Sequence, residues 1–407
     1  MKRLRSKSPL RLNRDAEKLI SLSTGLVASG SRAEDRYWEA AIMTLAEKMM
    51  TGGHDAAIES ALDHTFKSNL AAHDVLIELI ESGAECTTLE INNVRWDVLL
   101  LAIPLVAWSK YSVPSGPVSS ENVASIVPHL HGHVLADNAR LSMSPYLYSI
   151  DQMPRDFSSV HKMAQKLGEA AITGTTPKFD FTKMSETAPL LADTRFLLAA
   201  VAVSTSEALF RWQDVAKEKG QEKDGDSRGE RVSRTECLEK WIAQCRPNLA
   251  RLLPGCAFES LLPDAYFVNC RESDRRVRPY GVRSAINFLE TTLKTTAPQL
   301  RAIVAGFGEE HVDEYRIAFT KRGSDDVVHG IVWPLFGRED DDAQPTPWQE
   351  VESVLSECKL GEVTRLSGLF APEFCEDCGA PLFADADSEM VHPELPEEAE
   401  TPVAHYH

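Results

Sequence analysis

Two long apolar runs place the strongest constraint on how this chain can fold. Residues 98–103 read Val-Leu-Leu-Leu-Ala-Ile, and residues 195–203 read Arg-Phe-Leu-Leu-Ala-Ala-Val-Ala-Val. Unbroken apolar runs of this length indicate strands that are buried on both faces of a sheet. Helical periodicity appears between them, over residues 120–135 and 157–171. Strands that alternate with helices predict a layered α/β arrangement over residues 88–215.

The composition narrows the class of protein. A chain of 407 residues is long for a single core and predicts two or three domains. Its net charge of −18 argues against nucleic-acid binding over the whole body, because phosphate binding needs a basic face. The longest apolar run, residues 98–108, is too short to cross a bilayer, and no secretory signal is visible. Eight irregularly spaced cysteines are typical of reduced thiols, so we expect a cytoplasmic protein that does not enter a membrane.

Three segments, one at each end of the chain and one inside it, have a biased composition. Residues 1–14 are strongly basic, which predicts a solvated tail or an arm that contacts RNA, DNA or an anionic partner. Residues 216–236 are charged and nearly free of large apolar side chains, so we expect a disordered linker. Residues 384–407 are acidic and rich in proline, which is typical of a disordered tail.

The N-terminal part, residues 15–87, is predicted to form consecutive helices. Ser31 and Glu34 have the spacing of a capping box, in which each side chain satisfies a free amide at a helix start. Apolar residues then recur at helical spacing until the pair Gly52-Gly53, which ends the run. Short helices punctuated by glycine predict a module of helical hairpins.

The C-terminal part, residues 237–372, carries a recognisable order of elements. We expect strands at 258–268, 300–307, 315–320, 327–336 and 363–370, and helices at 279–293 and 348–358. With one additional strand, this is the β-α-β-β-α-β order of a ferredoxin-like sandwich. The predicted fold class is therefore α+β, with N-terminal helical hairpins, a central α/β layer and a C-terminal ferredoxin-like unit.

One short motif suggests chemistry by its spacing. Cys375 and Cys378 are separated by two residues and followed by Gly379, as in one knuckle of a zinc ribbon at residues 373–383. Glu376 and Asp377 favour neutral thiols, which argues against a redox pair. A structural zinc site is the leading interpretation, and an empty knuckle-like turn is the alternative. The predicted third ligand is His392, and the fourth is open among Cys256, Cys270, His405, His407 or a partner.

A cluster of arginines is the second candidate site. It surrounds Pro279 at the predicted start of a helix and consists of Arg271, Arg275, Arg276, Arg278 and Arg283. Guanidinium groups around a helix N-terminus could bind a phosphate or a carboxylate. Glu272 and Asp274 lie among them, so local ion pairing is the competing interpretation.

Three histidines in the predicted helix at 120–135 also invite a metal interpretation. Helical geometry places His129 and His133 on one border of the apolar face and His131 on the opposite border. Three side chains arranged in this way cannot converge on one ion. Solvated border positions are the favoured interpretation.

Several stretches, taken together, are similar to a known family. They are ASGSRAEDRYW at 28–38, SIDQMPR at 149–155, LADTRFL at 191–197, LLPDAY at 261–266, CRESDRRVRP at 270–279 and EFCEDCGAPLF at 373–383. They resemble a betaproteobacterial family known only as a domain of unknown function, and the resemblance extends over nearly the whole chain. It implies a bacterial cytosolic setting, no established activity and no catalytic residue.

Two functional hypotheses follow from these features. The first is a non-catalytic protein that binds a ligand or a protein partner and is stabilised by a zinc knuckle. The second is an enzyme that acts on an anionic small molecule held by the arginine cluster. Nucleic-acid binding is restricted to the basic N-terminal arm, and an oligomer is compatible with either hypothesis.

Overall fold

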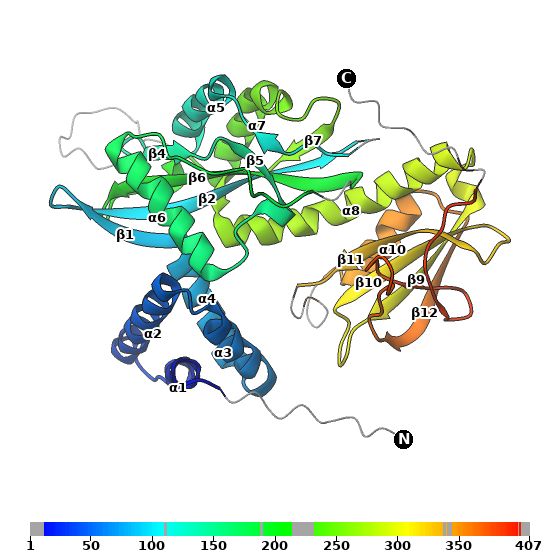
Figure 1. The fold of residues 1–407 in the computed structure, drawn as a ribbon, viewed down its shortest axis with the longest axis horizontal. Coiled ribbons are helices and arrows are strands. Elements are labelled where there is room, and N and C mark those ends of the chain that lie inside the picture. Colours follow the sequence, from blue (N-terminus) through cyan, green and yellow to red (C-terminus); the bar gives the residue numbers. More distant parts are fainter. Residues whose placement is uncertain are drawn as a thin grey trace, which may run out of the picture.

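The described chain forms a block of four helices, a large central sheet and a smaller C-terminal sheet (Figure 1). The computed structural model describes residues 12–109, 112–187, 190–213, 232–336, 339, 344–397 and 399. Most of the predicted basic tail, most of the predicted linker and the end of the predicted acidic tail lie outside these residues. The combination of helices and sheets confirms the predicted α+β class. None of the described helices has both the length and the apolar character needed to cross a membrane.

The N-terminal helices begin where the sequence supplies capping side chains. They are α1 (Arg14–Val27), α2 (Arg32–Gly52), α3 (Asp55–Ser68) and α4 (Leu70–Glu85). Side-chain oxygens of Asn13, Ser31 and Asn69 accept hydrogen bonds from backbone N–H groups in the first turns of α1, α2 and α4. Gly53, with a φ of 69°, ends α2 in the left-handed conformation. The apolar faces of the four helices meet in one buried cluster.

The centre of the large sheet is the antiparallel pair β2 (Val94–Trp108) and β6 (Ala192–Ser204). Successive side chains of β2 point to opposite faces of the sheet. Leu100 joins the cluster formed with the N-terminal helices, whereas Leu101 joins a second cluster on the other face, and both side chains are fully buried. The predicted strands that are buried on both faces are therefore confirmed.

Helices cover both faces of this sheet. Helix α6 (Phe157–Thr173) packs with α1–α4 on one face, and α5 (Ser120–His133) and α7 (Arg234–Ala250) cover the other (Figure 1). The sheet order is β1-β2-β6-β5-β3, with β4 paired to β6 and with β7 and β8 paired to β2. The remaining strands are β1 (Cys86–Ile91), β3 (Gly116–Pro117), β4 (Arg140–Met143), β5 (Tyr146–Ser149), β7 (Ala257–Ser260) and β8 (Asp264–Ala265).

Helix α8 (Tyr266–Thr292) differs most from the prediction. The strand expected at 258–268 is divided into β7 and β8, which pair with β2 in the central sheet. The helix then begins at Tyr266 and continues through Pro279, which lies inside it instead of at its start. Residues 266–278 carry many charged side chains and little apolar periodicity, which explains why the sequence pattern did not indicate a helix there.

The C-terminal sheet has the order β11-β10-β9-β12, in which β9 and β12 are parallel and the other pairs are antiparallel. Its strands are β9 (Leu300–Phe307), β10 (Glu314–Lys321), β11 (Val327–Pro334) and β12 (Glu362–Phe370). Helix α10 (Pro347–Glu357) and the C-terminal half of α8 cover one face. The predicted ferredoxin-like unit is not confirmed, because its first strand belongs to the other sheet and three strands follow one another before α10.

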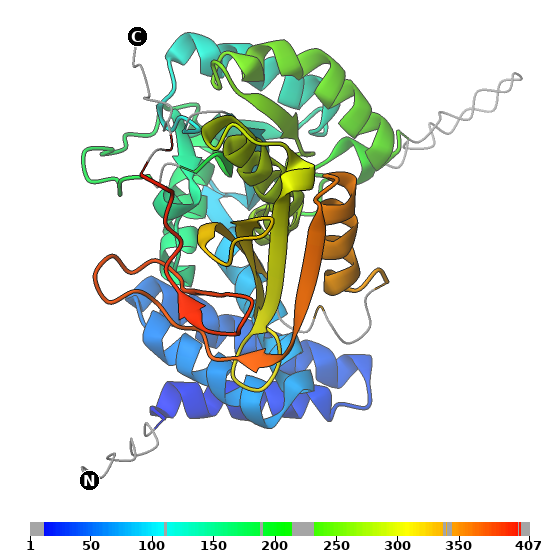
Figure 2. The same ribbon diagram turned by 90° about the vertical axis from the view of Figure 1, so that its right-hand side faces the viewer.

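The segment that follows β12 covers the other face of the C-terminal sheet (Figure 2). It contains the short strands β13 (Phe383–Ala384) and β14 (Met390–Val391). The ring of Phe383 lies so close to Gly330 of β11 that a Cβ there would be 2.3 Å from the ring. The backbone N–H of Glu394 donates to the carbonyl of Val327 at 3.0 Å. The prediction of disorder from residue 384 onward is therefore wrong for this part of the tail, because apolar residues among the acidic ones pack on the sheet.

The N-terminus of α8 is capped by a carboxylate from the N-terminal helices. Ala265 at the N-cap position has no side-chain acceptor, and Glu85 at the end of α4 accepts the Phe267 N–H at 2.9 Å instead. Burial raises the pKa of Glu85 to about 7, although the Phe267 N–H acts in the opposite direction. Between its ordinary value of 4.5 and about 7, the folded chain therefore holds a proton that the unfolded chain has released.

This raised pKa predicts a stability that falls with rising pH. The contribution of Glu85 is fully present below pH 4.5 and is lost as the pH rises to about 7, because over this range folding takes up a proton from a solution in which protons become scarcer. Glu85→Gln keeps an acceptor for the Phe267 N–H and cannot titrate. We expect its loss of stability between about pH 5 and 8 to be smaller than that of the wild type by about 2 kcal/mol. Urea unfolding at the two pH values measures this difference.

The exposed Glu59 of α3 offers a matched control, and Glu59→Gln should retain the wild-type pH dependence. Some dependence should remain in Glu85→Gln, because burial raises the pKa of Asp274 to about 6 and acts in the same direction. A Glu85→Gln protein with the full wild-type slope would contradict this role of Glu85.

Candidate functional site

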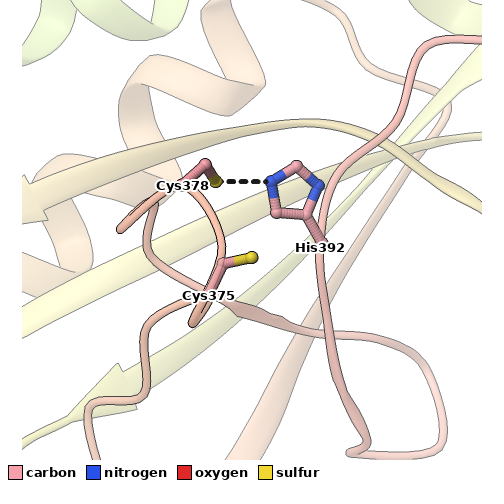
Figure 3. Close-up of side chains that lie close together, drawn as sticks. All are labelled: Cys375, Cys378 and His392. Atoms are coloured by element: carbon pink, nitrogen blue, oxygen red, sulfur yellow. Dashed lines mark hydrogen bonds between the residues drawn. The ribbon is translucent and has the colours of Figure 1, made fainter.

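The structure brings Cys375, Cys378 and His392 together (Figure 3). One ligand atom from each residue lies within 4.8 Å of the other two, and Cys378 Sγ is 3.3 Å from His392 Nε2. His392 directly follows β14, whereas the two cysteines precede β13, so two separate segments contribute to the cluster. Two thiols and an imidazole are the donor types that zinc prefers. The residues present therefore fit three positions of a tetrahedral zinc site.

A tight turn sets the position of the two thiols. The N–H of Gly379 donates to the carbonyl of Cys375 at 2.9 Å, and the N–H of Cys375 donates to the carbonyl of Ala380 at 2.8 Å. Gly379 has a φ of 72°, a conformation that a residue with a Cβ rarely adopts. The turn that the sequence motif predicts is therefore formed.

Backbone amides in this turn favour the thiolate of Cys375. The N–H of Cys378, and then that of Asp377, hydrogen bond to this sulfur and lower the pKa of the thiol. The negative charge of Asp377 acts in the opposite direction and is the weaker influence. The charge of Asp377 thus has the expected influence on Cys375, but the backbone N–H groups outweigh it. A thiolate at this position is the form that binds a metal ion.

Arg316 of β10 holds the base of the knuckle, a role that no local sequence pattern indicated. Its side chain is fully buried, and its Nη1 donates to the carbonyls of Glu373 and Leu382 on either side of the turn. Its Nε donates to Glu314 Oε1 at 2.6 Å, and the guanidinium lies over the ring of Phe307 at 4.3 Å. One buried cation thus attaches the knuckle to the C-terminal sheet.

The fourth ligand is not found among the cysteines proposed for it. Cys256 packs against the cluster on the α5–α7 face of the central sheet, and Cys270 packs against the cluster on the opposite face. Neither joins the three knuckle residues. The other two candidates, His405 and His407, lie outside the described residues.

The five arginines of the second candidate site are each paired with a carboxylate. The pairs are Arg271–Glu81, Arg275–Glu339, Arg276–Glu272, Arg278–Glu339 and Arg283–Glu357, at 2.6–3.1 Å. Because α8 begins at Tyr266, these arginines do not surround a helix N-terminus as expected. Four of them, Arg275, Arg276, Arg278 and Arg283, line a cavity of about 780 Å³ beside α10. Of the two interpretations of this cluster, an anion site and local ion pairing, the structure shows the ion pairs.

The three histidines of α5 lie as helical geometry requires. His129 Nε2 is 2.9 Å from Asn248 Nδ2, and His133 Nε2 is 3.1 Å from Gln244 Oε1, so both face α7. Burial and the nearby Arg211 lower the pKa of His131, on the other border of the helix. These residues do not form a common site.

The anchoring role of Arg316 makes a prediction about metal binding. Arg316→Met fills the space but removes the charged donor from the carbonyls of Glu373 and Leu382, and only the Glu373 carbonyl keeps another donor, the Leu382 N–H at 3.0 Å. The turn therefore loses its attachment to β10. We expect the affinity for zinc to fall at least about tenfold, as for other groups that orient metal ligands. Competition with a chromophoric chelator measures this affinity. Arg322→Met, at an exposed position in the same hairpin, should bind zinc as tightly as the wild type; equal affinities for all three proteins would refute the role of Arg316.

Comparison with known proteins identifies the family but no characterised relative. A comparison with curated proteins and one with solved structures found no match. The sequence model of the family described as "Protein of unknown function (DUF2863)" matches residues 4–406, so the chain belongs to this family.

Proposed function

We propose that this chain is a non-catalytic binding protein whose C-terminal sheet is secured by a structural zinc ion. The observation that carries this proposal is the approach of three ligand atoms, from Cys375, Cys378 and His392, to within 4.8 Å of one another. They lie on a preformed turn, and a buried arginine holds the base of that turn. A ligand set that is assembled before the ion arrives lowers the cost of ordering the site on binding.

The position of the cluster favours a structural role for the metal. Residues of the knuckle do not contribute to the walls of the cavities beside α8, where a substrate would be enclosed. A structural zinc ion usually has four protein ligands. His405, His407 or a partner supplies the fourth in this proposal.

Local pairing of charges supports binding over catalysis. An enzyme that acts on an anionic substrate is the competing function, with the arginines of α8 as its recognition site. Arg278 lines the 780 Å³ cavity, but its guanidinium makes two hydrogen bonds to Glu339, at 2.8 and 3.2 Å. A substrate would have to displace this carboxylate from a buried arginine, which costs several kcal/mol. We place the protein in the bacterial cytosol, where its irregularly spaced cysteines would remain reduced.

The zinc site predicts that Cys375→Ser loses both metal and stability. Wild-type protein purified without chelators should carry one zinc per chain in native mass spectrometry. The Cys375→Ser variant should be free of metal, and its free energy of unfolding should fall by at least about 2 kcal/mol, as expected for the loss of a structural metal.

Cys256→Ser provides the control, because Cys256 is half-buried but lies outside the cluster. This variant should retain its zinc. Wild-type protein that carries no metal, or a Cys375→Ser variant that unfolds like the wild type, would remove the basis for the structural site.

A further inference from the structure

A second cavity, of about 690 Å³, lies between the C-terminal half of α8 and the edge of the central sheet. Helix α8 runs from the central sheet to the C-terminal sheet, so this cavity lies where the two layers meet (Figure 1). Cavities of this size at such junctions are the usual location of small-molecule sites. The knuckle contributes no residue to it, and of the five clustered arginines only Arg283 lines it.

One stripe of α8 forms a wall of this cavity. Tyr280, Ser284, Asn287, Phe288 and Thr291 recur at helical spacing and all line it. Between them, Val282, Ile286 and Leu289 face the opposite way and are buried in the core of the C-terminal domain. The helix is therefore held in place by its other face, so it cannot move inward and close the cavity without breaking up that core.

The opposite wall comes from the central sheet and is aromatic where it meets the helix. Trp108, at the end of β2, stacks on Tyr280 with ring centroids 4.1 Å apart and planes 11° apart. The hydroxyl of Tyr280 donates to Glu259 Oε2 at 2.9 Å, which fixes the orientation of the ring. Leu191 and Ala257 continue this wall. The cavity thus offers a rigid apolar surface with hydroxyl and amide groups along one side.

Among the described residues that line the cavity, Arg283 is the one cation. Arg283 lines both this cavity and the 780 Å³ cavity beside α10, and its guanidinium pairs with Glu357 at 2.8 Å. Both side chains of this pair are exposed, at 42% and 57%. Exposed pairs of this kind contribute little to stability. The guanidinium can therefore exchange Glu357 for the anionic group of a ligand at small cost.

We propose that the 690 Å³ cavity binds a small amphipathic molecule, with an apolar ring-sized body and one anionic group. The body would lie against the Trp108–Tyr280 stack and Phe288, and the anionic group would pair with Arg283. This inference rests on the proposed binding role and names the class of ligand. It does not depend on the metal, because the knuckle contributes no residue to the cavity.

Two fluorescent probes that differ by one sulfonate group can test this site. Anilinonaphthalene sulfonate has an aromatic body and an anionic group, and phenylnaphthylamine is its neutral counterpart. We expect the wild type to bind both. Ser284→Trp fills the cavity and should weaken both at least about tenfold. Arg283→Gln should weaken the sulfonate about three- to tenfold and leave the neutral probe unchanged.

Matched variants control for non-specific effects. Glu352→Trp adds an indole to an exposed position of α10 that lines neither cavity, and Arg36→Gln removes an exposed charge from α2. Both should bind the probes like the wild type. If Ser284→Trp does not fold, Asn287→Trp at the exposed rim obstructs the same space. Absence of probe binding to the wild type, or equal binding by the cavity-filling variant, would overturn the proposal.

The proposed zinc site and the proposed ligand site can be tested independently of each other. Probe titration before and after removal of zinc with a chelator should give the same affinity, because no residue of the knuckle lines the cavity. Protein that carries zinc but binds no probe refutes only the ligand site. Protein that binds the probes through Arg283 but carries no zinc refutes only the metal site.

Discussion

The pairing of β2 with β6 is the interaction on which the rest of the fold depends. Each strand is apolar along nearly its whole length, so neither face of the sheet can be left to solvent. One face receives the N-terminal helices and α6, and the other receives α5 and α7. Strand β1 pairs with the first part of β2, and β7 and β8 pair with its later part. Both β7 and β8 come from the sequence immediately before α8. The start of α8 is in this way placed by the central sheet.

Helix α8 connects the central sheet to the C-terminal sheet. Its first half is polar and lies across β2 and β6, where Asn269 Nδ2 donates to the carbonyls of Ala102 and Leu262. Its second half supplies the apolar side chains on which the C-terminal sheet packs. One continuous helix thus contributes to the core beside the central sheet and to the core of the C-terminal sheet. The two sheets are therefore not free to move as independent domains. The ion pairs of its arginines, with carboxylates from α4, α10 and Glu339, add fixed contacts along its length.

The sequence predicted the parts of this structure that depend on local patterns. The apolar runs identified both central strands, and Cys375, Cys378 and His392 were found because spacing along the chain brings them together. Patterns of this kind could not identify α8, whose first half carries charged residues where an amphipathic helix would carry apolar ones. They also could not show that Arg271 and Arg283 meet carboxylates 190 and 74 residues away. The anchor at Arg316 was missed for the same reason, because its acceptors lie 57 and 66 residues further along.

The way in which the C-terminal sheet is covered has a consequence for how the chain is made. Strands β9, β10 and β11 follow one another and can pair as soon as they leave the ribosome. One of their faces, however, is closed by residues 373–395, and the parallel strand β12 can be added only after α10 has crossed over. A sheet of β9, β10 and β11 alone, formed before residues 373–395 are made, would expose an apolar face and an unpaired edge, which is the kind of surface that chaperones bind. This exposure would end when residues 373–395 leave the ribosome and pack on the sheet.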